Sequence, residues 1–106
     1  MASEAKKLQH KAEATMQLHL TIQVWQKGQW YVARCPELDF VSHGPSPEKA
    51  RRNLLEVVQI QFEEMRTLGT LEDHLLECGY VTGDAPLIPQ TEMISFERSS
   101  IQVVYA

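Results

Sequence analysis

Glu37 and Asp39, two acids separated by one residue in a predicted turn, are the pair best placed for metal-dependent chemistry. A nuclease that uses metal ions needs several converging carboxylates, which hold two ions about 3.5–4 Å apart. The interiors of the predicted strands contain no acid that could complete such a set. Two acids beside Pro36 are more typical of a solvated turn, in which Asp39 hydrogen-bonds the local backbone. We therefore expect no metal site.

Cysteine, histidine and serine give no stronger case for catalysis. Arg34 could lower the pKa of the Cys35 thiol, but no motif ties a histidine or an aspartate to it, and a buried turn cysteine is favoured. Ser42 and Ser46 have no nucleophile-elbow motif around them, and no glycine-rich phosphate loop is present. No histidine stands at metal-ligand spacing from another among His10, His19, His43 and His74. The sequence thus predicts a protein that is not an enzyme and needs no cofactor.

Three short segments have the pattern of β-strands. Residues 16–25 alternate between apolar and polar side chains, which predicts a half-buried strand over Met16–Trp25. Residues 26–29, which contain Gly28, predict a hairpin loop. Two further β-type runs, Trp30–Arg34 and Phe40–His43, flank a turn at residues 35–39. The three runs therefore predict an antiparallel meander.

A corner and a long helix follow the third strand. Gly44 predicts a backbone conformation closed to residues with a Cβ, and Ser46-Pro47 supplies a helix cap and a first-turn proline. From Pro47 to about Leu68 the apolar period is helical, with one broad face that would cover the sheet. That face is predicted to contain Ala50, Leu54, Leu55, Val57, Val58, Phe62, Met65 and Leu68.

The C-terminal third reads as a short helix and a β segment. Gly69 should end the long helix and Thr70 cap a short one over Leu71–Cys78, before an exposed connection at Thr82–Thr91. Met93–Tyr105 is rich in β-formers and should supply one or two strands. The predicted order is β-β-β-α-(short α)-β, an α+β fold with the helix packed on one face of an antiparallel sheet. Residues 1–15 are predicted to be a flexible arm and residues 16–106 a single domain.

These elements and their residues resemble the HicB-like antitoxin domain. In that family an aromatic pair precedes Val-Ala-X-Cys-Pro-Glu-Leu, and a short strand, a glycine and a Ser or Thr two residues on lead into a helix that opens with acids and Ala. The stretch WYVARCPELDFVSHGPSPEKA at 30–50 follows this order, and the resemblance spans about residues 18–68. The matching residues are Tyr31, Val32, Ala33, Cys35, Pro36, Glu37, Leu38, Gly44, Ser46, Glu48, Ala50, Asn53, Leu54 and Glu56. Lys49 departs from the pattern, because the family commonly has an acid there that completes a capping box.

The resemblance implies a HicB-like fold, a partial ribonuclease H-like arrangement, and an antitoxin function. Such a protein binds and neutralises a small basic ribonuclease toxin of the HicA type, which cleaves messenger RNA. It acts by covering the RNA-binding face and catalytic histidine of the toxin, so it needs shape and charge rather than reactive groups. Glu37, Asp39, Glu63 and Glu64 could steer a basic partner, and Ile60, outside the apolar arc, could contact it. Each of these residues could equally be ordinary solvated surface.

Charge and composition limit the other classes of partner. The 106 residues carry a formal net charge of −4, with no cluster of Lys and Arg interleaved with aromatics, so direct nucleic-acid binding is not expected. Many family members carry a DNA-binding segment after this core, and residues 80–106 are too short and too β-like to supply a helix-turn-helix. No signal-peptide core or run of about 18 apolar residues is present, which predicts no membrane association. Cys35 and Cys78 stand far apart, which favours a reducing, cytoplasmic compartment.

The chain end predicts self-association. Ile101, Val103, Val104 and Tyr105 would form an apolar strand, and such a strand at a sheet edge invites pairing with another chain in a closed dimer or tetramer. Two alternatives to the antitoxin hypothesis remain open. One is a stand-alone oligomeric HicB-like binding domain without a toxin partner, and the other is a weak metal-dependent nuclease.

Overall fold

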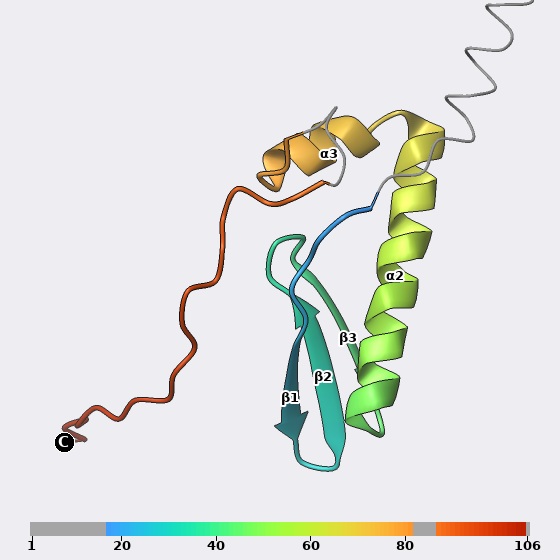
Figure 1. Cartoon of the computed structure of the whole chain (residues 1–106). Coiled ribbons are helices and arrows are strands. Elements are labelled where there is room, and N and C mark those ends of the chain that lie inside the picture. Colours follow the sequence, from blue (N-terminus) through green and yellow to red (C-terminus); the bar gives the residue numbers. More distant parts are fainter. Residues whose placement is uncertain (1–16, 82–86, 106) are drawn as a thin grey trace, which may run out of the picture.

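The computed structural model describes residues 17–81 and 87–105 as an α+β arrangement in which two helices follow a three-stranded sheet (Figure 1). Its elements are β1 (Gln23–Lys27), β2 (Trp30–Cys35), β3 (Phe40–Gly44), α2 (Pro47–Leu68) and α3 (Leu71–Glu77). The strand order is β1-β2-β3 with antiparallel pairing throughout, and α2 packs along the sheet. The predicted meander and long helix are thus confirmed. The predicted arm at 1–15 lies outside the described residues.

The two faces of the sheet differ in what covers them. Ala33 and Cys35 of β2 point toward α2 and are fully buried, together with Ala50 and Leu54 of the helix. Because side chains alternate along a strand, the residues between them point to the opposite side, which we call the outer face. From the register of the strands, the outer face consists of Gln23, Trp25, Lys27, Trp30, Val32, Arg34, Val41 and His43.

The first strand begins later than its alternation predicts. The predicted strand Met16–Trp25 was wrong at both ends, because β1 starts at Gln23 and runs to Lys27, leaving only Gly28-Gln29 as the turn. The first residue of β1, Gln23, pairs with Arg34. Only Cys35 of β2 lies beyond this pair, so β2 offers almost no backbone to the residues that precede β1. The backbone N–H of Thr21 donates instead to the side chain of Glu37. Residues 17–22 therefore run extended with a single bridge, from Leu18 to Leu87, in place of a strand ladder. Leu18, Leu20 and Ile22 still pack against the core.

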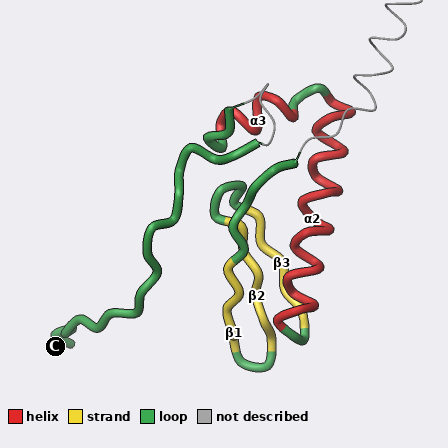
Figure 2. The backbone as a smooth tube through the Cα atoms, viewed as in Figure 1, coloured by secondary structure: helices red, strands yellow, loops and turns green. Residues whose placement is uncertain are grey.

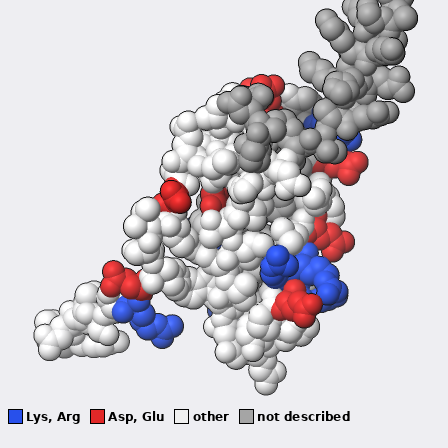
Figure 3. Space-filling model, in the orientation of Figure 1, with Lys and Arg blue, Asp and Glu red and all other residues white. Residues whose placement is uncertain are grey.

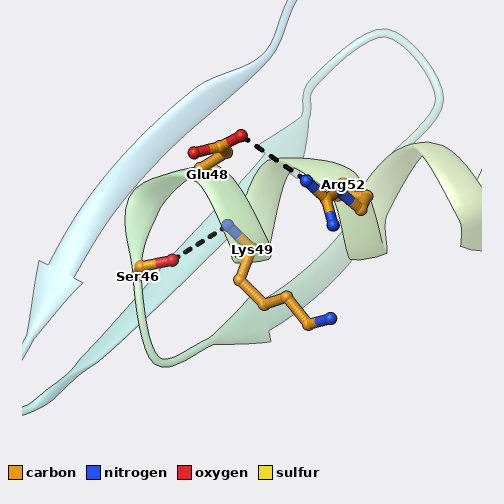
Figure 4. Close-up of polar contacts among 4 residues, drawn as sticks. All are labelled: Ser46, Glu48, Lys49 and Arg52. Atoms are coloured by element: carbon orange, nitrogen blue, oxygen red, sulfur yellow. Dashed lines mark hydrogen bonds and ion pairs between the residues drawn. The ribbon is translucent and has the colours of Figure 1, made fainter.

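Helix α2 begins and ends where the sequence predicts. The Ser46 hydroxyl accepts a hydrogen bond from the Lys49 backbone N–H at 3.1 Å, and Glu48 pairs with Arg52 one turn on (Figure 4). At the other end Gly69 adopts the left-handed conformation at φ 77°. The hydrogen bond from the Lys49 N–H to Ser46 is thus present, although Lys49 does not supply the acid that completes a capping box.

Burial of the apolar arc of α2 decreases toward the C-terminal end of the helix. Ala50, Leu54 and Val58 are buried as predicted, but Leu68 is 69% exposed because the sheet does not extend beneath the end of the helix. Thr70 stands at the N-cap of α3, which ends at Glu77. Contrary to the prediction, the Thr70 side chain makes no cap hydrogen bond. The Thr70 hydroxyl donates to the Met65 carbonyl instead.

Gly44 is required for a different reason from the predicted one. Gly44 is not one of the described glycines that have a positive φ. A Cβ built at Gly44 would lie 2.8 Å from the backbone N of Ala50 and 3.1 Å from the carbonyl carbon of Lys49. The glycine therefore permits close approach of the third strand to the first turn of α2.

A second part of the core closes the end of the sheet near α3. Leu38, Leu75, Tyr80 and Leu87 are buried there, and the Tyr80 hydroxyl donates to the His19 carbonyl at 2.7 Å. Leu87 also forms a parallel bridge with Leu18. The prediction of an exposed connection over 82–91 is thus wrong at Leu87, and residues 82–86 lie outside the described residues.

The predicted C-terminal strands at 93–105 do not form in the described chain. These residues are extended and exposed, and the segment is drawn wholly as loop beyond α3 (Figure 2). The backbone just before the segment gives it no ladder to continue, since Pro89 has no N–H and Gln90 donates to Gly79, and the segment does not pair with the open edge of β1. We call residues 91–105 the C-terminal segment.

Candidate functional site

Glu37, in the turn between β2 and β3, holds the segment before β1 through hydrogen bonds to Thr21. Its carboxylate accepts hydrogen bonds from the Thr21 backbone N–H at 2.9 Å and from the Thr21 hydroxyl at 2.5 Å. Partial burial by itself would raise the pKa of Glu37, but the hydrogen bonds from Thr21 outweigh it and hold the pKa below its ordinary value. The side chain that the sequence suggested for partner steering is therefore engaged within the molecule.

We expect Glu37→Gln to lower the free energy of unfolding at neutral pH by about 1.5–3 kcal/mol, the usual range for hydrogen bonds to a charged group. A depressed pKa stabilises the fold above the ordinary pKa of 4.5, and this contribution disappears as the pH falls through the folded-state value. Denaturant unfolding at a series of pH values measures it. The difference in the free energy of unfolding between wild type and variant should decrease below about pH 4.5.

Glu64→Gln is the matched control, because Glu64 is an exposed residue of α2. Its unfolding midpoint should match that of the wild type at every pH. A Glu37→Gln protein as stable as the wild type at neutral pH would show that the Thr21 contacts do not hold the segment before β1.

Asp39 lies on the surface of the same turn. It has a positive φ of 58°, a conformation that Asp tolerates better than most residues, and its carboxylate lies 3.6 Å from the Arg34 guanidinium. Both side chains are exposed, so this ion pair contributes little stability. Glu37 and Asp39 thus have different partners, and the turn does not direct both at one point.

Cys35 is buried at the end of β2, as predicted. Burial, together with the neighbouring carboxylate of Glu37, raises the pKa of the Cys35 thiol to about 11. Arg34 points to the outer face and pairs with Asp39, so it does not lower this pKa. A thiol that stays protonated is a poor nucleophile.

One pair of reactive groups was missed by the sequence reasoning. On α3 the Sγ of Cys78 lies 3.6 Å from the Nε2 of His74, whose ring stacks on Phe40. Their spacing of four residues on a predicted helix was the available signal. Burial, followed by the charges of Glu77 and Asp39, raises the pKa of Cys78, which disfavours a thiolate. In the described part of the chain, no three His, Cys, Asp or Glu side chains come together as a metal site.

A shallow groove of about 530 Å³ opens where two extended segments separate beyond the Leu18–Leu87 bridge. Residues 19–21 line one side and residues 88–93 the other, and Glu37 also borders it. Glu37 faces Thr21, and the other carboxylate, Glu92, is exposed. The groove therefore has no arrangement of groups directed at a common reacting atom.

Helix α2 brings three of the predicted partner-binding residues together. Ile60, Glu63 and Glu64 are spaced three and four residues apart, so they occupy neighbouring positions on the helix surface. Ile60 is 57% exposed, both glutamates are exposed, and Glu63 lies 3.8 Å from Arg66. We call these three residues the α2 patch. It is a candidate protein-binding surface in which an apolar side chain is flanked by acids.

The predicted oligomer residues are among the most exposed apolar side chains of the described chain. They are Ile101, Val103, Val104 and Tyr105, and Ile94 and Phe96 accompany them. Large exposed apolar surfaces mark interaction sites more often than catalytic ones. The surface thus presents two candidate contact regions, the α2 patch and the C-terminal segment.

Comparisons with known protein families, with curated proteins and with solved structures each gave no match. Within residues 17–81 and 87–105, no helix is long and apolar enough to cross a lipid bilayer. The class that the structure defines is an α+β domain in which a helix packs on a three-stranded antiparallel sheet.

Proposed function

We propose that this protein is a HicB-like antitoxin that binds a small basic ribonuclease of the HicA type and blocks its access to RNA. The observation that carries the proposal is the unit from Trp30 to Ala50, whose residues match the family pattern and whose roles are structural. In this unit Glu37 clamps the turn, Gly44 admits the helix, and Ser46 caps it. A HicB-like affiliation accounts for all three.

The α2 patch supports a binding role. Its two acids would attract a basic partner and accelerate association, and Ile60 would lose water on contact. Space-filling Figure 3 shows charged side chains along α2 and on the C-terminal segment, while the area over β1 and β2 is mostly uncharged. Helix α2 carries basic as well as acidic side chains, so the proposed contact with a basic partner rests on the two acids beside Ile60 and not on the charge of the whole helix. Inhibition would follow from covering the partner, without reactive groups on this chain.

Binding and inhibition are tested with the small basic reading frame nearest to this gene, co-expressed and purified as a potential toxin. We expect a stable complex, loss of RNA cleavage on addition of this protein, and weaker binding at high salt. Glu63→Lys combined with Glu64→Lys should raise the dissociation constant about tenfold or more, since reversing charges at a complementary surface makes it repel the partner.

Glu48→Lys is the matched control, because Glu48 is an acid on the same helix about 18 Å from Ile60 along its axis, at 1.5 Å per residue. It should bind like the wild type. Undiminished RNA cleavage in the presence of excess protein would refute the antitoxin proposal and leave the stand-alone oligomeric domain as the better account. Cleavage of RNA by this protein alone, lost in Glu37→Ala or Asp39→Ala, would instead favour the nuclease alternative.

A further inference from the structure

The outer face of the sheet carries large apolar side chains that the described chain leaves uncovered. Trp25 is 44% exposed, and Trp30 and Val41 are each 54% exposed. Helix α2 covers only the opposite face, where Ala33 and Cys35 are fully buried. Two tryptophans and a valine on one side of a small sheet form an apolar surface of the kind that binds another chain.

The C-terminal segment has the composition that this surface would accept. Residues 91–105 make no hydrogen bond to another described residue, and their apolar side chains lie in water. The segment contacts the outer face through the rings of Phe96 and Trp25, whose centroids lie 5.2 Å apart. Its C-terminal end lies away from the sheet (Figure 1).

We propose that residues 97–105 of one molecule lie on the outer face of a second copy, in a symmetric dimer that exchanges the two segments. Each molecule carries both the apolar segment and the face that would bury it, so two copies related by a twofold axis satisfy both at once. The Phe96–Trp25 contact fixes the start of the segment beside its own outer face and directs the remainder outward. The occupant is therefore a second copy, because the far half of the segment leaves its own domain.

The composition of the segment is consistent with this arrangement. Residues 97–105 carry no net charge, because Glu97 and Arg98 cancel, and Arg34 of the outer face is paired with Asp39. The β-branched residues Ile101, Val103 and Val104 suit an extended conformation packed on a sheet. This inference goes beyond the antitoxin proposal and does not depend on it. The α2 patch lies on the helix that covers the other face of the sheet, so each surface can be altered separately.

Light scattering coupled to size exclusion tests the dimer. The full chain should have twice the 12.1 kDa mass of one chain, and a chain ending at Thr91 should have that single mass with its helical circular dichroism retained. Val41→Lys should also give the monomer, because it replaces an apolar side chain of the outer face by a charge. Ile60→Lys is the matched control, as an equally exposed aliphatic residue on α2, and it should leave the mass unchanged.

Disulfide trapping distinguishes a second copy from folding back of the same chain. Val41→Cys and Val103→Cys are placed in separate molecules that both carry Cys78→Ala, and the two proteins are mixed and oxidised. We expect a cross-linked pair that contains one molecule of each kind. A mass of one chain for the wild type at micromolar concentration, or cross-linking only when both cysteines share a chain, would overturn the proposal. Loss of the dimer in Ile60→Lys but not in Val41→Lys would also overturn it and move the interface to α2.

Discussion

Gly44→Val is expected to unfold well below the denaturant midpoint of the wild type, with a loss of about 1–3 kcal/mol or more. The added Cβ would meet the Ala50 N at 2.8 Å and the Ala50 Cα at 3.2 Å, both in the first turn of α2. Neither atom can rotate away, since both belong to the helix backbone. Relief requires the helix to move off the sheet, which would open the packing of Ala50 and Leu54 against β2.

Two further variants separate close approach from backbone conformation. Gly44→Asn should be as harmful as Gly44→Ala, because any Cβ makes the same contact. At Gly69, which has φ 77° and open space around its Cβ position, Asn should be tolerated better than Ala. Equal stability of Gly44→Ala and wild type in chemical denaturation would show that the third strand and α2 are not in close contact.

Tyr80→Ala is expected to destabilise the protein by about 3–5 kcal/mol, the range for removing a buried aromatic side chain. Tyr80 is 1% exposed, and its hydroxyl donates to the His19 carbonyl at 2.7 Å. It therefore joins the chain after α3 to the segment before β1. Burial raises the pKa of Tyr80 well above its ordinary value, so the hydroxyl remains a donor across the accessible pH range.

Tyr80→Phe isolates the hydrogen bond from the packing. It should cost about 1–3 kcal/mol, because the His19 carbonyl loses its donor within a partly buried site. Leu68→Ala is the control, since Leu68 is 69% exposed and lies in neither of the two candidate contact regions. Should Tyr80→Ala unfold with the wild-type midpoint in thermal and denaturant melts, the packing of α3 against residues 17–22 would be refuted.

Local patterns in the sequence determined the elements whose signals lie within a few residues. Ser46-Pro47 and Gly69 mark the ends of α2, because a cap and a left-handed terminator act on adjacent backbone groups. The turn at 36–39 and the pairing of β2 with β3 also followed from neighbouring residues. Alternation placed Leu18, Leu20 and Ile22 on the core side, although it could not distinguish a strand from an extended segment that pairs only through the Leu18–Leu87 bridge.

Tertiary structure decided the features that depend on residues far apart in the chain. The start of β1 is set by the contact of Thr21 with Glu37, sixteen positions away. The alternation of apolar and polar residues cannot predict such a contact. The reason for Gly44 is the proximity of Ala50, which only the packing of helix on sheet creates. The β-rich residues at 93–105 form no strand because a strand requires a hydrogen-bonded partner. In the described chain they pair with no other segment, although β1 has only β2 as a neighbour and therefore an open edge. Propensity is a property of the segment alone, whereas a strand is a property of the segment and its neighbour.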